Sequence, residues 1–154
     1  MTYAVSVETV SPRILAAVRA RMKAADIPVG FRSSLDQVWA FLRSQPGLRS
    51  DGHNVFLYHH ASGHPATGLD IDFGVEVTRP FQAAAPITCV ATPAGRAAVV
   101  VHRGPYRAMS AAHAALHQWC RDNGETIGAA SWEIYGDHHD DENQLETTIV
   151  YLLV

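Results

Sequence analysis

One carboxylate stands in a segment that otherwise reads as a buried strand: Glu133, within Trp132-Glu133-Ile134-Tyr135. Removing a carboxylate from water is costly unless it is paired or hydrogen-bonded, so an acid at such a position needs a reason. A carboxylate among aromatic side chains is suited to a cationic guest, and each neighbouring ring adds a cation–π attraction of about 0.5–2 kcal/mol. Glu133 is therefore the first candidate for a binding or catalytic group.

Glu133 also marks the place where an internal repeat diverges. A shift of 77 positions sets Phe56 over Glu133. The same shift sets Tyr58 over Tyr135. Order and periodicity agree better than identity, which indicates an ancient duplication; chance similarity of two short segments is the alternative. The aligned segments are Asn54–His59 with Ser131–Gly136 at this shift, and Leu69–Val77 with Leu145–Leu153 at a shift of 76.

Each repeat reads as two strands, a helix and two further strands. Tyr3–Val10 alternates apolar and polar residues as a half-buried strand does. Ile14–Met22 fits either a helix or a strand, but its counterpart Arg96–Arg103 contains three consecutive valines from Val99. Because β-branched residues favour strands, we predict strands at both places.

Two helices are predicted from their end signals. The first is expected to begin at a capping box of Ser34 and Gln37 and to stop at Pro46-Gly47. The second is expected to open near Gly104-Pro105 and to end before Gly124. The apolar face of the first helix is Leu35, Val38, Trp39 and Leu42.

Two such units indicate an α+β fold, in which duplicated βαββ units with pseudo-twofold symmetry form a curved antiparallel sheet with two helices and a central ligand groove. We predict one domain over residues 1–154, with the first repeat at about 1–80 and the second at about 85–154. The terminal segment Thr148–Val154 could lie at an exposed edge of the sheet and recruit another copy.

Composition excludes several classes of partner. The net charge is −3 and no Lys/Arg cluster occurs, which argues against direct nucleic-acid binding. No apolar run approaches the roughly 20 residues that span a bilayer, and no signal-peptide pattern is present. Cys89 and Cys120 suggest neither a disulfide framework nor a metal-binding pair. We expect a cytoplasmic protein with no membrane association and no cofactor.

Histidines cluster at two polar connections. One is Ala61–Gly68 with the two residues before it, and the other is Asp137–Asn143. Without cysteine partners or fixed ligand spacing, we expect solvated loops and no metal site. His113 and His117 are four positions apart and could share a helix face as a zinc pair does. Since no third ligand lies nearby in sequence, we expect both on the surface. The loop histidines are His59, His60, His64, His138 and His139.

Three segments together resemble the GyrI-like small-molecule-binding domain, which is also the effector-binding domain of AraC-type and MerR-type multidrug regulators. The resemblance covers nearly the whole chain and implies a stand-alone form, because the sheet begins at Tyr3 and leaves no room for a helix-turn-helix. It also implies a groove in which a glutamate, here Glu133, meets cationic aromatic compounds. The three segments are Pro93-Ala94-Gly95-Arg96-Ala97, His102-Arg103-Gly104-Pro105-Tyr106 and Trp132-Glu133-Ile134-Tyr135.

The expected ligand-binding residues are one acid and a set of aromatic side chains. For Glu133 the alternatives are a surface strand residue and a structural pair with an arginine such as Arg96 or Arg103. For Trp39 the alternative is core packing, and Tyr151 either lines the groove or fills the core. The set comprises Glu133, Tyr135, Phe56, Tyr58, Trp39 and Tyr106.

Two classes of function remain. The first is a module that binds a small hydrophobic or cationic aromatic ligand, with a regulator protein or a second copy as its possible partner. The second, implied by the resemblance, is a hydrolase of cyclopropane-bearing DNA-alkylating compounds. There Glu133 would activate water, and Tyr135, Tyr58 or Tyr106 would donate a proton. Binding needs less precise geometry and is preferred. A DNA gyrase inhibitor-like protein is a further alternative.

Overall fold

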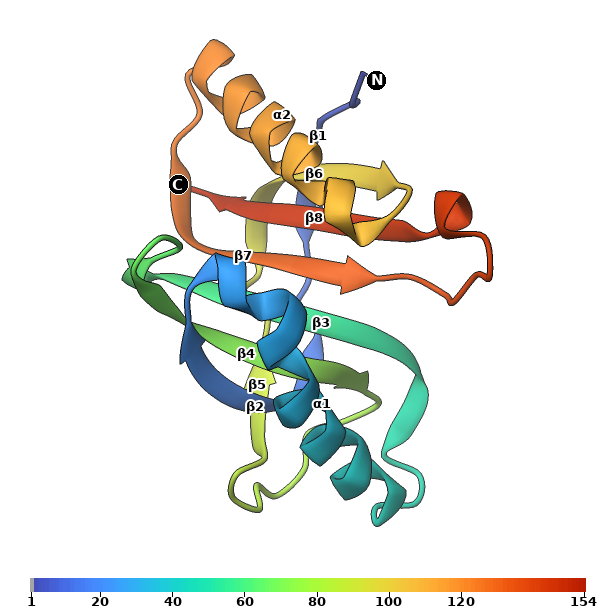
Figure 1. The fold of residues 1–154 in the computed structure, drawn as a ribbon. Coiled ribbons are helices and arrows are strands. Elements are labelled where there is room, and N and C mark those ends of the chain that lie inside the picture. Colours follow the sequence, from blue (N-terminus) through green and yellow to red (C-terminus); the bar gives the residue numbers. More distant parts are fainter. Residues whose placement is uncertain (1) are drawn as a thin grey trace.

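Over the residues that the structure describes, eight strands form one antiparallel sheet, and two helices cover one of its faces (Figure 1). The structure, a computed structural model, describes residues 2–154 except for the side chains at 49–51. This arrangement confirms the predicted α+β class. The strands are β1 Ser6–Val10, β2 Ile14–Met22, β3 Arg49–His64, β4 Gly68–Val77, β5 Thr88–Ala91, β6 Gly95–Arg103, β7 Ile127–Tyr135 and β8 Glu146–Leu153. The helices are α1 Ile27–Arg43 and α2 Met109–Asp122, with short 3-10 turns η1 Ala24–Asp26, η2 Tyr106–Ala108 and η3 Glu142–Gln144.

The strand order is symmetric about the centre of the sheet when each strand is matched to its counterpart in the other repeat, that is β1 to β5, β2 to β6, β3 to β7 and β4 to β8. It runs β1-β6-β8-β7-β3-β4-β2-β5, so that each strand of one half has its counterpart at the mirrored place in the other. The first strand of each predicted repeat is exchanged: β1 pairs with β6 and β5 pairs with β2. The two halves therefore share one sheet, joined at the centre by β3 and β7.

The register of β3 and β7 places the divergent pair at the centre of this symmetry. Phe56 lies directly opposite Glu133, with Val55 opposite Ile134 and Leu57 opposite Trp132. Phe56 and Glu133 are also the residues that the repeat superposes. The pseudo-twofold axis therefore passes between these two residues.

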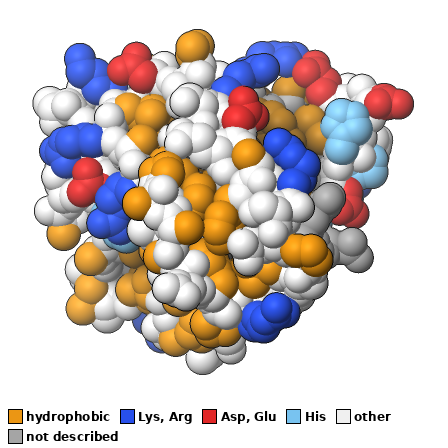
Figure 2. Space-filling model, turned by 90° about the horizontal axis from the view of Figure 1, so that it is seen from below, with side chains coloured by type: hydrophobic (Ala, Val, Ile, Leu, Met, Phe, Trp, Pro, Cys, Tyr) orange, Lys and Arg blue, Asp and Glu red, His pale blue; other side chains and the backbone are white. Residues whose placement is uncertain are grey.

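The sheet has a helix face, covered by α1 and α2, and an inner face without helices. α1 packs mainly on β2 and β4, and α2 mainly on β6, which leaves the central strands between the helices (Figure 1). On the inner face, Leu15 of β2, Trp132 of β7 and Val99 of β6 join one buried cluster, so the sheet must curve around it. At the α1 end of the molecule, apolar side chains run in a band across the surface and charged groups surround it (Figure 2).

The start of α1 differs from the prediction. Ile14–Met22 is a strand as expected, but α1 begins at Ile27 rather than near Ser34, which is buried inside the helix. Pro28 occupies the first turn of α1, where its missing N–H costs no hydrogen bond and its fixed φ suits a helix. Gln37 donates to the carbonyl of Ser33 rather than forming a capping box.

Two further features differ from the possibilities that the sequence suggested. The terminal strand β8 lies between β6 and β7, so it is not an edge; the edges of the sheet are β1 and β5. The first polar connection is also shorter than predicted, because β3 continues through His64. In the described part of the chain, no helix is both long and apolar enough to cross a bilayer.

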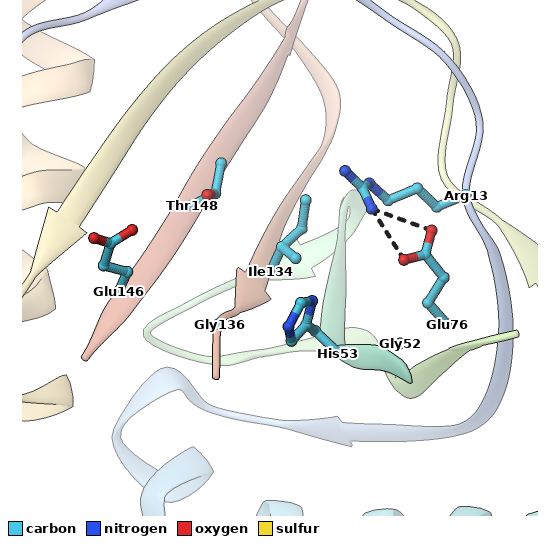
Figure 3. Close-up of a pocket in the computed structure, with 8 residues that line it drawn as sticks. All are labelled: Arg13, Gly52, His53, Glu76, Ile134, Gly136, Glu146 and Thr148. Carbon is cyan, nitrogen blue, oxygen red and sulfur yellow. Dashed lines mark hydrogen bonds and ion pairs between the residues drawn. The ribbon is translucent and has the colours of Figure 1, made fainter. Parts of the chain in front are cut away.

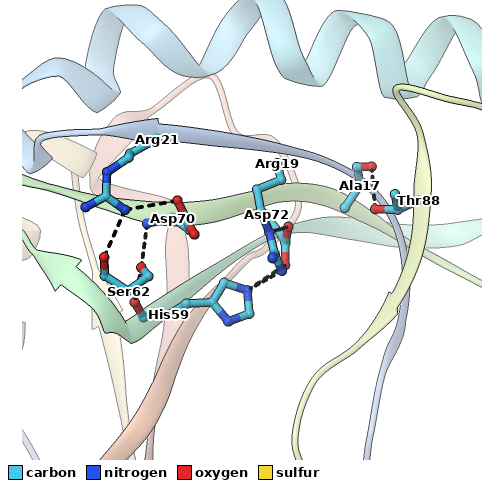
Figure 4. Close-up of polar contacts among 8 residues, drawn as sticks. All are labelled: Ala17, Arg19, Arg21, His59, Ser62, Asp70, Asp72 and Thr88. Atoms are coloured by element: carbon cyan, nitrogen blue, oxygen red, sulfur yellow. Dashed lines mark hydrogen bonds and ion pairs between the residues drawn. The ribbon is translucent and has the colours of Figure 1, made fainter.

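On the inner face, the carboxylate of Asp72 is buried, with its side chain 1% exposed. Arg19 donates to both of its oxygens, from Nε at 2.9 Å and from Nη2 at 3.0 Å, and His59 Nε2 lies 2.6 Å from Oδ2 (Figure 4). Hydrogen bonding to Asp72 raises the pKa of Arg19. In the neighbouring pair, Arg21 donates to Asp70 through a single contact, from Nη1 to Oδ1 at 3.2 Å, and Asp70 is 32% exposed.

We expect Arg19→Met to destabilise the fold far more than Arg21→Met. The first substitution leaves a fully buried carboxylate without its guanidinium and should cost about 3 kcal/mol of unfolding free energy. The second leaves a hydrated carboxylate and should cost less than about 1 kcal/mol. Urea unfolding of the two variants beside the wild type measures both, and equal losses would show that Asp72 does not depend on Arg19.

Candidate functional site

Glu133 lies on the helix face at the centre of the sheet and is only 5% exposed. Three side chains hold its carboxylate. Tyr58 and Tyr135 donate their hydroxyl protons to Oε1, with O···O distances of 2.5 and 2.8 Å. His113 Nε2 lies 2.7 Å from Oε2. Both oxygens of the buried acid are therefore hydrogen-bonded, without an arginine or lysine.

Strand pairing explains how side chains from three strands and a helix converge. On the helix face, one row across the sheet contains Ile149, Glu133 and Phe56. The next row contains Tyr151, Ser131 and Tyr58. Since alternate residues of a strand share a face, Tyr58 and Tyr135 approach the carboxylate from opposite sides. The acid is thereby enclosed by its neighbours on the sheet and by α2 above.

A chain of hydrogen bonds leads from Glu133 toward the surface. His113 Nδ1 lies 2.8 Å from the Tyr151 hydroxyl, and His117 Nε2 lies 3.2 Å from the same oxygen. One assignment of protons satisfies every contact: His117 donates to Tyr151, Tyr151 donates to His113 Nδ1, and His113 Nε2–H donates to Glu133. Every donor in this chain then points toward the carboxylate.

A third histidine adjoins the chain. His60 Nε2 lies 2.7 Å from Ser131 Oγ, and the imidazole stacks on Tyr151 with ring centroids 5.9 Å apart. Burial lowers the pKa of His60 and of His117, and the neighbouring histidines lower both further. These two imidazoles are therefore neutral near pH 7, so they bring no full positive charge to the acid.

The tyrosines around the acid remain protonated. Burial is the main reason that the pKa values of Tyr58 and Tyr135 lie well above 10, and the charge of Glu133 raises them further. The pKa of Tyr151 is raised for the same two reasons. All three phenols therefore act as hydrogen-bond donors and not as anions at any ordinary pH.

Aromatic rings form the apolar part of the site. The Phe56 ring lies 4.8 Å from that of Tyr135 and 5.7 Å from that of Phe31 on α1. Tyr106, in η2, meets Tyr135 edge-on at 5.4 Å and is 47% exposed. The acid is therefore bordered by rings from both halves of the chain, and Tyr106 connects this border to the surface.

The structure brings together five of the six predicted residues. Tyr58 and Tyr135 bond to Glu133 and Phe56 lies opposite it, while Tyr106 joins the group through its ring contact with Tyr135. Trp39 instead packs against the cluster beneath α1. The proposed structural partners of Glu133 are elsewhere. Arg96 pairs with Glu125, and Arg103 pairs with Glu146, so the arginine alternative is wrong.

Sequence reasoning missed the contribution of α2. His113, expected on the surface, bonds to Glu133 and Tyr151. The available signal was helical spacing, because His113 falls on the same stripe as Met109, Ala112 and Leu116, which are buried. Tyr151, for which two readings were open, packs in the core beneath α2 and also belongs to the hydrogen-bond chain.

Two cavities lie away from this site. One, of about 560 Å³, opens on the inner face at the ends of β3, β4, β7 and β8, where Arg13 pairs with Glu76 (Figure 3). The other, of about 410 Å³, lies along β1 and β6. Glu133 lines neither of them. Among the described residues, no group of three or more His, Cys, Asp or Glu side chains could hold a metal ion.

Comparison with solved structures shows the same fold in three proteins. The C-terminal domain of EcmrR superposes with a TM-score of 0.82 at 22% identity, covering 100% of this chain and 99% of that one. SAV2435 bound to tetraphenylphosphonium gives 0.66 at 13% identity, covering 100% and 94%. A hydrolase encoded by lin2189 from Listeria innocua gives 0.66 at 10% identity, covering 97% and 91%.

The family itself is established by sequence. No curated protein sequence matches the chain. The family model of the GyrI-like small molecule binding domain, however, matches residues 3–153, which is nearly the whole length. With the duplicated topology and the central acid already described, this match leads to one conclusion: the chain belongs to the GyrI-like small-molecule-binding domain family.

Proposed function

We propose that this domain binds an aromatic cation and that Glu133 supplies the opposing charge. The observation that carries the proposal is the set of hydrogen-bond partners around this carboxylate. Glu133 is 5% exposed, and its partners are two phenols and one imidazole rather than a guanidinium or ammonium group. A buried carboxylate with these partners has its hydrogen bonds satisfied while its negative charge is not paired with a permanent cation. A cationic guest would supply that pairing.

The surrounding rings suit the same class of guest. The ring centroids of Phe56 and Tyr135 lie 4.8 Å apart, beside the acid. Each ring face can contribute about 0.5–2 kcal/mol to a cation, and apolar ring surface adds the hydrophobic part of affinity. SAV2435, which shares the fold, has been seen with tetraphenylphosphonium. That structure supports an aromatic cation as the class of ligand here.

Entry of a guest requires aromatic side chains to move. Glu133 is almost fully covered, while Tyr106 is 47% exposed and is held to Tyr135 by a ring contact. α1 and α2 stand on either side of the central strands (Figure 1). Phe31 on α1 packs against Phe56, and Tyr106 before α2 packs against Tyr135, so these two rings are the candidates for the cover. We infer that rotation of Tyr106 and of the half-buried Phe31 admits the guest to the acid.

One observation favours a second candidate, hydrolysis of a cyclopropane-bearing alkylating compound. The chain from His117 through Tyr151 and His113 could carry a proton to or from Glu133. Water would add its oxygen to a ring carbon and give its proton to Glu133. The electron pair of the broken C–C bond would end on a phenolate-like oxygen. Tyr58 and Tyr135 donate their hydrogen bonds to Glu133, which leaves Tyr106 as the candidate donor to that oxygen. Binding remains the stronger proposal, because hydrolysis also requires this donor to be placed at the departing oxygen, whereas binding requires only the buried carboxylate and its aromatic neighbours.

The charge requirement predicts a selective effect of Glu133→Gln. We expect wild-type protein to bind tetraphenylphosphonium and Glu133→Gln to bind it about thirtyfold more weakly, a loss of roughly 2 kcal/mol. Isothermal titration calorimetry measures both. Glu142→Gln, the same change at an exposed glutamate, is the control and should bind as wild type does. Tetraphenylborate has the same shape with a negative charge and should not bind wild type. Equal affinity of wild type and Glu133→Gln for tetraphenylphosphonium would contradict the proposal.

The hydrolase candidate makes the opposite prediction about turnover. We expect wild type, Glu133→Gln and His113→Gln all to leave a cyclopropane-bearing alkylating compound unchanged over hours, as followed by liquid chromatography. Ring-opened product from wild type, absent with Glu133→Gln although that variant still binds the compound, would replace the binding proposal with the enzymatic one.

A further inference from the structure

Two buried polar atoms in the described part of the chain have no hydrogen-bond partner: Asn54 Oδ1 and Thr147 Oγ1. Buried polar groups are nearly always hydrogen-bonded, and each exception calls for an explanation because its desolvation is not compensated. Thr147 is fully buried. If two such atoms lie near each other, a single ligand could supply the missing hydrogen bonds to both.

Strand register places both atoms beside Tyr135. Thr147 of β8 pairs directly with Tyr135 of β7. Asn54 of β3 lies two positions before Phe56, so it shares the helix face with Phe56 and falls next to Tyr135 on the other side. Asn54 and Thr147 thus flank Tyr135, about 10 Å apart at two strand spacings, in the row adjacent to Glu133.

A satisfied residue in the same row provides a contrast. His102 of β6 pairs with Thr147 and is also buried. Its Nδ1 lies 2.9 Å from the Tyr3 hydroxyl and its Nε2 lies 3.0 Å from the carbonyl oxygen of Pro105. The fold therefore supplies partners for a buried polar group in this row, yet leaves the two atoms beside the acid without them.

We propose that Asn54 and Thr147 form a polar subsite of the Glu133 site, which selects aromatic cations that carry amino or hydroxyl groups on their rings. The inference rests on the proposed function. The guest's charged ring system would lie over Phe56 and Tyr135, and its N–H or O–H groups would donate to Asn54 Oδ1 and to Thr147 Oγ1. An amide oxygen can only accept, so the guest must bring at least one donor.

The position of Tyr106 fits this role. Its ring packs edge-to-face with that of Tyr135, which lies between the positions of Asn54 and Thr147 in the sheet, and Tyr106 is nearly half exposed. Rotation of Tyr106, together with Phe31, would bring a guest to this row and to Glu133. The subsite therefore lies where a guest enters.

Two acridinium probes test the subsite. 3,6-Diaminoacridinium has an amine at each end of a flat cationic frame, and 10-methylacridinium has the frame and charge without amines. We expect wild type to bind the diamino cation at least tenfold more tightly, and Thr147→Val or Asn54→Leu to lower that preference about fivefold each, as one lost hydrogen bond would. Affinity for 10-methylacridinium should stay within twofold of wild type. Fluorescence titration measures all of these.

The controls separate this inference from the proposed function. Thr148→Val changes the adjacent threonine, which faces the inner cavity, and should leave both affinities unchanged. If wild type binds neither probe, the cation site itself is wrong. If it binds both, and Thr147→Val and Asn54→Leu leave the preference as it was, the subsite is wrong. Thermal unfolding of Thr147→Val should occur at or above the wild-type temperature, which shows that any loss of preference is not a loss of folding.

Discussion

The pairing of β3 with β7 is the contact on which the rest of the molecule depends. It is the only ladder between the two halves at the centre of the described sheet, and its register sets Phe56 opposite Glu133. A slip by one residue would turn Glu133 to the inner face and Trp132 to the helix face. The apolar cluster around Trp132 and the polar partners of Glu133 oppose that slip together. One register therefore specifies both the core and the site.

The exchange of the outer strands reinforces this joint. β1 belongs to the first repeat but completes the sheet of the second, and β5 does the reverse. Neither half can form its full set of strands without the other. The site at the axis, which takes Tyr58 from one half and Glu133, Tyr135 and His113 from the other, is thus available only when both halves are assembled.

The site residues that depend on strand alternation and on the internal repeat could be predicted from the sequence. The contacts between a helix and the sheet could not. Glu133, Tyr135, Phe56 and Tyr58 follow from strand parity once the repeat is aligned, and the structure groups them. His113 could not be linked to Glu133 in the same way, because the contact joins α2 to β7 and depends on how the helix is seated. Likewise, Pro28 resembles a helix breaker in sequence, yet in the first turn it starts α1 seven residues before the expected cap.

Strand order was the least predictable level. An apolar final segment suits an edge or a centre equally well, because its hydrophobic pattern is the same in both. β8 lies inside the sheet since the exchanged strand β1 occupies the edge beyond β6. The unpartnered oxygens of Asn54 and Thr147 were equally invisible, because a missing partner is a property of three-dimensional neighbours and not of residue type.

The molecule contains two buried carboxylates, Asp72 and Glu133, whose partners differ. Asp72 and Glu133 are both almost fully covered, but Asp72 lies against a guanidinium that donates to both oxygens. That charge is neutralised within the fold, and the pair needs nothing further. Glu133 accepts hydrogen bonds on both oxygens from Tyr58, Tyr135 and His113, but none of these partners is a permanent cation. Since the same chain can place an arginine beside a carboxylate when only stability is required, the absence of one among the described neighbours of Glu133 favours a charge kept for a guest.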